Sequence, residues 1–142
     1  MFMKNLRNLA IRHFSIDKSG SHSDFHPINT SDIYNPIAFI EEILTKNKVV
    51  LFMKGSPESP QCGFSNYTVQ ALKFYNVKNY HYVNILENPV LREEVKKYSD
   101  WPTYPQLYIN KEFIGGCDIL AEMHKADTLK ALFEKYGVIS KD

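Results

Sequence analysis

The run Val49-Val50-Leu51-Phe52-Met53 is the feature that most limits how this chain can fold. Five consecutive apolar residues suit a strand with both faces buried, which is typical of a central parallel strand in a helix-covered sheet. A loop over residues 55–60, with one glycine and two prolines, follows the run. The chain is therefore expected to contain a small sheet with helices on both faces.

Hydrophobic patterns predict the elements around this strand. A first helix should begin at Pro36, after an Asn35 N-cap, and end at Lys48. Further helices are expected from Cys62 to about residue 75, over 90–98, around Leu120 and Met123, and over 129–136, and further strands over 80–85, 106–109 and 112–114. This order predicts an α/β fold with a small mixed four-stranded sheet flanked by helices.

Composition argues against several classes of protein. The 142 residues suit one domain plus a tail, and the net charge of +1 gives no electrostatic reason to expect nucleic-acid binding. No run approaches the ~18 apolar residues that a membrane-spanning helix needs. The two cysteines, Cys62 and Cys117, do not make the disulfide framework of a secreted domain, so a reducing compartment fits better.

The N-terminal region differs from the rest of the chain. Residues 1–16 hold three basic residues and no acid, and their apolar residues fall on one side of a helical projection. This pattern predicts an organelle transit peptide over 1–16, followed by a disordered linker over 17–31, a folded domain over 32–138 and a tail over 139–142. A basic tail without a targeting role is the alternative.

Cys62 is the residue best placed to carry chemistry. It lies between the loop that follows the buried strand and the start of the next helix. Backbone N–H groups and the positive end of the helix dipole favour a thiolate at such a position, and Lys54 could add a positive charge. A single cysteine can equally be a small buried apolar residue, so the local pattern alone leaves both interpretations open.

Four motifs favour a reactive Cys62 over a buried apolar one. In chain order they are Lys54-Gly55-Ser56-Pro57, Cys62-Gly63-Phe64-Ser65, Trp101-Pro102-Thr103-Tyr104-Pro105-Gln106 and Gly115-Gly116-Cys117-Asp118. Together they closely resemble the monothiol glutaredoxins of the CGFS class. The resemblance covers roughly residues 32–138 and implies a thioredoxin-like fold. The single-domain layout with a transit-like N-terminus is most similar to the mitochondrial members of that class, so the mitochondrial matrix is expected, with another organelle or the cytosol as alternatives.

The resemblance also implies a glutathione site centred on the Cys62 thiolate, with Phe64 beside the thiol. Lys54, Arg92 and Lys96 would face the glycine carboxylate. Two backbone segments would hold the rest of the ligand: Thr103, Tyr104 and a cis Pro105 at its cysteinyl part, and Gly116, Cys117 and Asp118 at its γ-glutamyl end. Each residue also has a purely structural alternative. The three cations could be solvated surface charges, Trp101 and Tyr104 could be core residues, and Gly115-Gly116 could be only a turn.

Two functions compete on this scaffold. One is transfer of a [2Fe–2S] cluster, for which Cys62 is the only metal ligand expected from each chain. Such a cluster needs four ligands, so two chains and two glutathione molecules would form a homodimer around it. Its partners would be iron–sulfur assembly and acceptor proteins, with BolA-like proteins as a further class.

The other function is glutathione-dependent reduction of mixed disulfides. It is expected to be weak at most, because Ser65 stands where dithiol relatives carry a resolving cysteine. Cys117 could pair with Cys62 or be a quiet neighbour of the glutathione site. A third alternative, a non-catalytic thioredoxin-like adaptor, is disfavoured because the site motifs are intact.

Overall fold

The computed structural model describes residues 35–140. The expected transit peptide (1–16) and linker (17–31) lie outside the described residues, as do 32–34 and 141–142. The helices are α3 (Pro36–Lys46), α4 (Gly63–Phe74), α5 (Pro89–Ser99), α6 (Cys117–Lys125) and α7 (Leu129–Lys135), with a 3-10 turn, η2, at Ile85–Glu87. The strands are β1 (Val49–Met53), β2 (His81–Asn84), β3 (Gln106–Ile109) and β4 (Glu112–Gly115).

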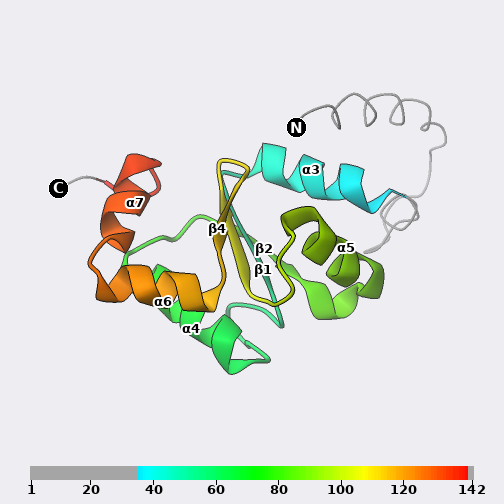
Figure 1. The fold of residues 1–142 in the computed structure, drawn as a ribbon, viewed down its shortest axis with the longest axis horizontal. Helices are drawn as coiled ribbons and strands as arrows, with labels where there is room; N and C mark the ends of the chain where they lie inside the picture. Colours follow the sequence, from blue (N-terminus) through cyan, green and yellow to red (C-terminus); the bar gives the residue numbers. More distant parts are fainter. Residues whose placement is uncertain (1–34, 141–142) are drawn as a thin grey trace.

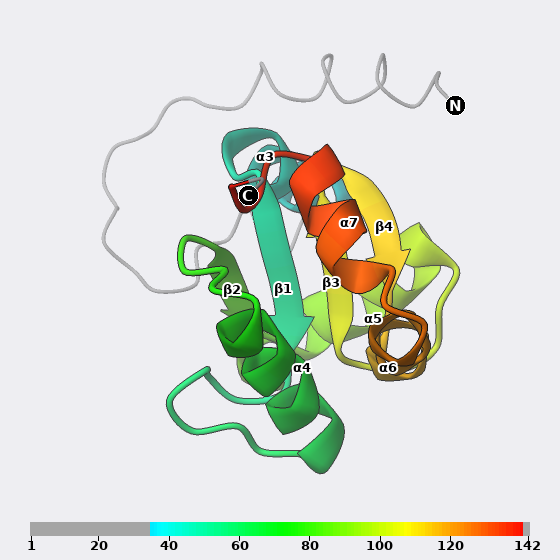
Figure 2. The same ribbon diagram turned by 90° about the vertical axis from the view of Figure 1, so that its left-hand side faces the viewer.

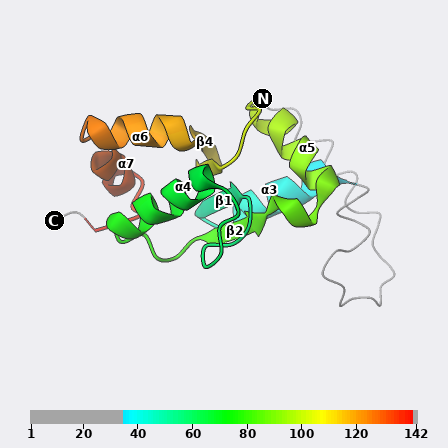
Figure 3. The same cartoon turned by 90° about the horizontal axis from the view of Figure 1, so that it is seen from below.

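The four strands form one mixed sheet between two layers of helices (Figure 1). The strand order is β2-β1-β3-β4, with β2 parallel to β1 and the β1–β3 and β3–β4 pairs antiparallel. Helices α3 and α5 lie on one side of the sheet, and α4, α6 and α7 lie on the other (Figure 3). The predicted α/β architecture is confirmed, although the central strand β1 is parallel to only one of its two neighbours.

Strand β1 supplies core residues to both layers. Val49, Leu51 and Met53 belong to the apolar cluster that includes α4, α6 and α7 residues. Val50 and Phe52 belong to the cluster with α3 and α5 residues. Because alternate side chains of a strand point to opposite faces, this division explains why all five residues are apolar and buried.

Most predicted boundaries hold to within one residue, and asparagines explain two of the differences. The first helix ends at Lys46 rather than Lys48, because Asn47 adopts an extended conformation. The strand expected over 80–85 ends at Asn84, whose side chain accepts the Leu86 N–H at 3.1 Å and starts the 3-10 turn. None of the helices within the described range is long and apolar enough to cross a membrane.

The predicted site residues meet near the C-terminal end of β1. The loop that leaves this strand leads to the start of α4, and Figure 2 shows both at one end of the sheet. The segment before β3 and the start of α6 complete the same region. Residues from distant parts of the chain are thereby brought to one place.

Candidate functional site

Cys62 is the N-cap residue of α4. Its backbone is extended (φ −159°, ψ 142°), and its carbonyl accepts the Asn66 N–H at 2.9 Å, which starts the helix. The side chain is partly exposed and the cysteine is free. The first N–H groups of α4 therefore surround an accessible thiol.

The pKa of the Cys62 thiol lies below its ordinary value. Partial burial is the largest single influence and raises the pKa, but four favourable interactions together outweigh it. These are the backbone N–H groups of Ser65 and Phe64, the Ser65 hydroxyl and the positive charge of Lys54. All four favour the thiolate, which is the nucleophilic and metal-binding form of cysteine.

Ser65 is a site residue that the sequence analysis did not assign to the site. Its side chain is fully buried, and its Oγ accepts the Lys54 N–H at 3.1 Å. The same hydroxyl acts on the Cys62 sulfur. Ser65 therefore links the end of β1 to the reactive thiol, and it was detectable as the first member of the buried i, i+3, i+4, i+7 face of α4.

The loop between Lys54 and Cys62 closes on itself. The Gln61 N–H donates to the Lys54 carbonyl at 2.9 Å, and the Gly55 N–H donates to Asn84 Oδ1 at 2.9 Å. Gly55 has φ +94°, and a Cβ there would lie 2.5 Å from the Ser59 carbonyl oxygen. Only glycine fits this position, which fixes the path of the loop into Cys62.

A groove of about 370 Å³ lies beside the thiol. Nine of the eleven predicted site residues line it: Lys54, Phe64, Arg92, Lys96, Thr103, Tyr104, Gly116, Cys117 and Asp118. Trp101 and Pro102 also line it and were not predicted to do so. The two predicted residues outside the lining are Cys62, which precedes Phe64 at the start of α4, and Pro105, which is buried.

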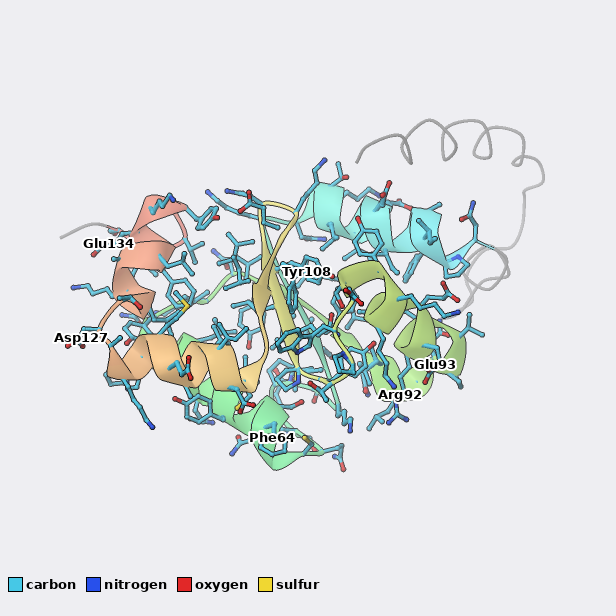
Figure 4. All side chains as sticks on the ribbon, in the orientation of Figure 1. Phe64, Arg92, Glu93, Tyr108, Asp127 and Glu134 are labelled. Carbon is cyan, nitrogen blue, oxygen red and sulfur yellow. The ribbon has the colours of Figure 1, made fainter. Side chains whose placement is uncertain are left out.

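One wall of the groove is attached to α5 by two hydrogen bonds. The Tyr104 hydroxyl donates to the Arg92 carbonyl at 2.6 Å, and the Trp101 N–H donates to the Lys96 carbonyl at 3.1 Å. Arg92 and Lys96 are one turn apart, so both side chains can lie on one side of α5. Figure 4 shows Arg92 on α5 and Phe64 at the start of α4.

The segment before β3 is held from inside by Gln106. This side chain is fully buried, and its Nε2 donates to the carbonyls of Trp101 and Thr103 at 3.0 and 3.1 Å. The following residues continue as β3, and the Tyr104–Pro105 peptide bond is cis, as expected. The Gln106 amide thus ties together the backbone of the wall to which Thr103 and Tyr104 belong.

Trp101 is not the core residue that the sequence suggested as one alternative. It is half-buried and lines the groove, with its ring 5.5 Å from that of Phe113. A Cβ on Gly116 would lie 3.0 Å from Trp101 Nε1. The indole therefore occupies the space that a larger residue at Gly116 would need, which gives this glycine a packing role.

Cys117 begins α6, directly after the Gly116 N-cap, but it differs from Cys62 in reactivity. Burial, followed by the negative charges of Asp118 and Cys62, raises the pKa of the Cys117 thiol. It is also a free cysteine. Cys62 is therefore the better nucleophile of the two.

Within residues 35–140, no group of three or more histidine, cysteine, aspartate or glutamate side chains is placed to hold a metal ion. The groove instead combines Lys54, which follows β1, two cations from α5 and Asp118 from α6, and it lies beside one activated thiol. Such a site can hold an extended ligand with a charged group at each end and present its middle to the thiol.

Known proteins resemble this chain over a large part of its length. Residues 49–114 match the model of the family described as Glutaredoxin. Glutaredoxin-related protein 5, mitochondrial, from Danio rerio is 48% identical over 101 residues, which cover 71% of this chain and 65% of that protein. Monothiol glutaredoxin-S14, chloroplastic, from Arabidopsis thaliana is 54% identical over 96 residues, which cover 68% and 55%.

The chain thus spans less than two thirds of the length of these two relatives. A solved structure gives fuller coverage. The solution structure of reduced poplar apo GrxS14 is 52% identical, with a TM-score of 0.61, and the match covers 69% of this chain and 89% of that one.

Proposed function

Because this chain belongs to the monothiol glutaredoxins, we propose that its groove binds glutathione and that the Cys62 thiolate is the reacting group. The order of charges along the groove carries this proposal. Lys54, Arg92 and Lys96 come from the β1 and α5 side, whereas Asp118 comes from α6 on the other side of the sheet. Glutathione has a lone carboxylate at its glycine end and an amine with a second carboxylate at its γ-glutamyl end.

Each part of glutathione has a counterpart in this arrangement. The three cations suit the glycine carboxylate. The backbone at Thr103 and Tyr104 suits strand-like pairing with the cysteinyl part, which places the ligand's sulfur toward Cys62. At the γ-glutamyl end, the first N–H groups of α6 suit the carboxylate and Asp118 suits the amine.

The cargo of this site is proposed to be a [2Fe–2S] cluster. A thiolate with a lowered pKa is a suitable iron ligand, and the cluster needs four. Cys62 from two copies and the thiols of two bound glutathione molecules would supply four sulfur atoms, so the cluster would join a homodimer. Two of the four ligands would be free small molecules, which favours release of the cluster to an acceptor protein.

Anaerobic reconstitution of the full chain with iron, sulfide and glutathione tests this proposal. The expected product is a coloured species at dimer mass that forms only when glutathione is present. Cys62→Ser should abolish the colour, and the matched variant Cys117→Ser should retain most of it, because Cys117 has a raised pKa. Equal loss in both variants, or a cluster that forms without glutathione, would contradict the proposal.

Reduction of glutathionylated proteins is the second candidate, and the lowered pKa of Cys62 favours it. The thiolate would attack the glutathione sulfur of a mixed disulfide, forming a Cys62–glutathione disulfide and releasing the protein thiolate. Because Ser65 replaces a resolving cysteine, a second glutathione thiolate would then release glutathione disulfide and regenerate Cys62. A colourless monomer that rapidly reduces glutathionylated substrates would favour this function over cluster transfer.

The location proposed for this activity is the mitochondrial matrix, with another organelle or the cytosol as the alternatives. One relative is named mitochondrial and the other chloroplastic, and residues 1–16 have a basic, acid-free composition. The proposed partners are iron–sulfur assembly and acceptor proteins, with BolA-like proteins as a further class. A fluorescent protein carrying residues 1–31 should enter mitochondria, and replacing Lys4, Arg7 and Arg12 with glutamine should prevent entry.

A further inference from the structure

An acidic residue lies next to the cationic side of the groove. Lys96 Nζ lies 3.4 Å from Glu93 Oε2, one turn back along α5. The Lys96 side chain is 30% exposed and lines the groove, whereas Glu93 is 62% exposed and does not line it. One of the three cations proposed to meet a ligand carboxylate therefore already has a carboxylate partner. Figure 4 shows Arg92 and Glu93 side by side on α5.

The backbone around this pair is fixed. The carbonyls of Arg92 and Lys96 accept hydrogen bonds from the groove wall, at 2.6 Å from the Tyr104 hydroxyl and 3.1 Å from the Trp101 N–H. This part of α5 is thereby held against the segment before β3. Exchange of the Lys96 ammonium between Glu93 and a ligand therefore needs only movement of side chains.

The charge of Glu93 is also felt within the groove. Burial is the main cause that raises the pKa of Tyr104, but Glu93 raises it further and Arg92 lowers it. The Tyr104 hydroxyl is buried and bonded to the Arg92 carbonyl, so the carboxylate of Glu93 acts on a residue of the groove wall. A ligand carboxylate beside Lys96 would also be repelled by the charge of Glu93.

We propose that Glu93 lowers the affinity of this groove and tunes its specificity by competing with the terminal carboxylate of the bound thiol peptide for the Lys96 ammonium. This inference rests on the proposed glutathione site. While Glu93 is present, the ligand carboxylate must share Lys96 with Glu93 or break their ion pair. The interaction of the ligand carboxylate with Lys96 therefore contributes less to the binding free energy. Without Glu93, the groove should bind glutathione more tightly and discriminate more strongly against ligands that lack the glycine carboxylate.

Helix α5 provides a matched control in the next pair of residues. Glu94 and Lys97 have the same i, i+3 spacing, with Lys97 Nζ 3.2 Å from Glu94 Oε2. Lys97 is 72% exposed and is not part of the groove lining. Glu93→Gln and Glu94→Gln therefore remove the same charge and the same kind of ion pair from one helix, and only the first frees a groove residue.

The test is calorimetric titration of the full chain with reduced glutathione and with its ester blocked at the glycine carboxylate. Glu93→Gln should tighten glutathione binding about two- to fourfold at low salt, which is the range of a partly exposed ion pair, and the gain should shrink as salt is added. Its affinity for the ester should stay at the wild-type value. Glu94→Gln should change the glutathione affinity by less than half as much.

Equal effects of the two variants on glutathione would overturn the role of Glu93, because they would reflect net charge alone. A Glu93→Gln variant that tightens glutathione and the ester equally would overturn it as well, because the effect would not involve the carboxylate. A wild-type chain that binds no glutathione would instead overturn the proposed function. The circular dichroism spectrum of each variant controls for folding.

Discussion

Replacing Ser65 with alanine should weaken the fold and raise the pKa of Cys62 at the same time. The Ser65 side chain is fully buried, and its Oγ accepts the part-buried Lys54 N–H at 3.1 Å. In the alanine variant this N–H loses its acceptor. Leaving a buried donor unpaired costs about 1–3 kcal/mol, so the free energy of unfolding should fall by that amount in urea titrations.

The pKa change should be partial, because the backbone N–H groups of Ser65 and Phe64 remain and act more strongly on Cys62 than the lost hydroxyl. The hydroxyl in turn acts more strongly than the charge of Lys54. Ser65→Ala should therefore raise the pKa of Cys62 further than Lys54→Met does. The assay is the rate of alkylation by iodoacetamide as a function of pH, measured in a Cys117→Ser background so that one thiol reacts.

The lowered pKa of Cys62 also makes the stability of the fold depend on pH. Because the pKa of Cys62 is lower in the folded chain, the thiolate stabilises the fold above the unfolded pKa, and this contribution is lost as the pH falls through the folded pKa. The stability difference between the wild type and Ser65→Ala should therefore be larger at alkaline pH than at acidic pH. An unchanged alkylation midpoint in Ser65→Ala, or a larger shift in Lys54→Met, would refute this reasoning. Ser59→Ala, in the exposed loop, is the control and should change neither quantity.

Gly55→Ala should lower the free energy of unfolding by about 1–3 kcal/mol, since φ is +94° there, whereas Gly63→Ala should have little effect because its Cβ would meet nothing within 4 Å. Gly116→Ala should push against Trp101, the single tryptophan, and thus shift its fluorescence and weaken glutathione binding; a wild-type spectrum and affinity would contradict this. Burial and then the charge of Glu41 raise the pKa of Tyr98 to about 12. The neutral Tyr98 therefore contributes stability that is full below pH ~10, the unfolded pKa, and is lost as the pH rises through the folded pKa. Tyr98→Phe should flatten this alkaline loss in urea titrations; an equally steep loss would argue against it.

The fold was largely predictable because its strongest signals are local. Asn35 and Pro36 start α3 as expected, with the Ala38 N–H donating to Asn35 Oδ1 at 3.2 Å. The apolar run of β1 required a sheet buried on both faces, and two helical layers supply that burial. The end of β2 was missed because Asn84 stops the strand with its side chain, which hydrophobic alternation does not reveal.

The residues that line the groove were largely predictable from the resemblance, whereas the residues that hold the groove in shape by packing and hydrogen bonds were less so. Lys54, Arg92 and Asp118 were placed together by resemblance, and they do line one groove. Gln106 was not assigned a role, because its hydrogen bonds run backward to the carbonyls of the preceding segment. Trp101 is half-buried rather than the core residue that was considered as an alternative. A large aromatic residue beside a proline gives no indication of which of its faces is exposed.

The central claim is that the groove beside Cys62 is a glutathione site, and an NMR titration of the 15N-labelled full chain with reduced glutathione tests it most directly. The account predicts saturable shifts of the backbone amides of Thr103, Cys117 and Asp118, which line the groove. No saturable shift at these amides, or shifts confined to residues elsewhere on the surface, would contradict it.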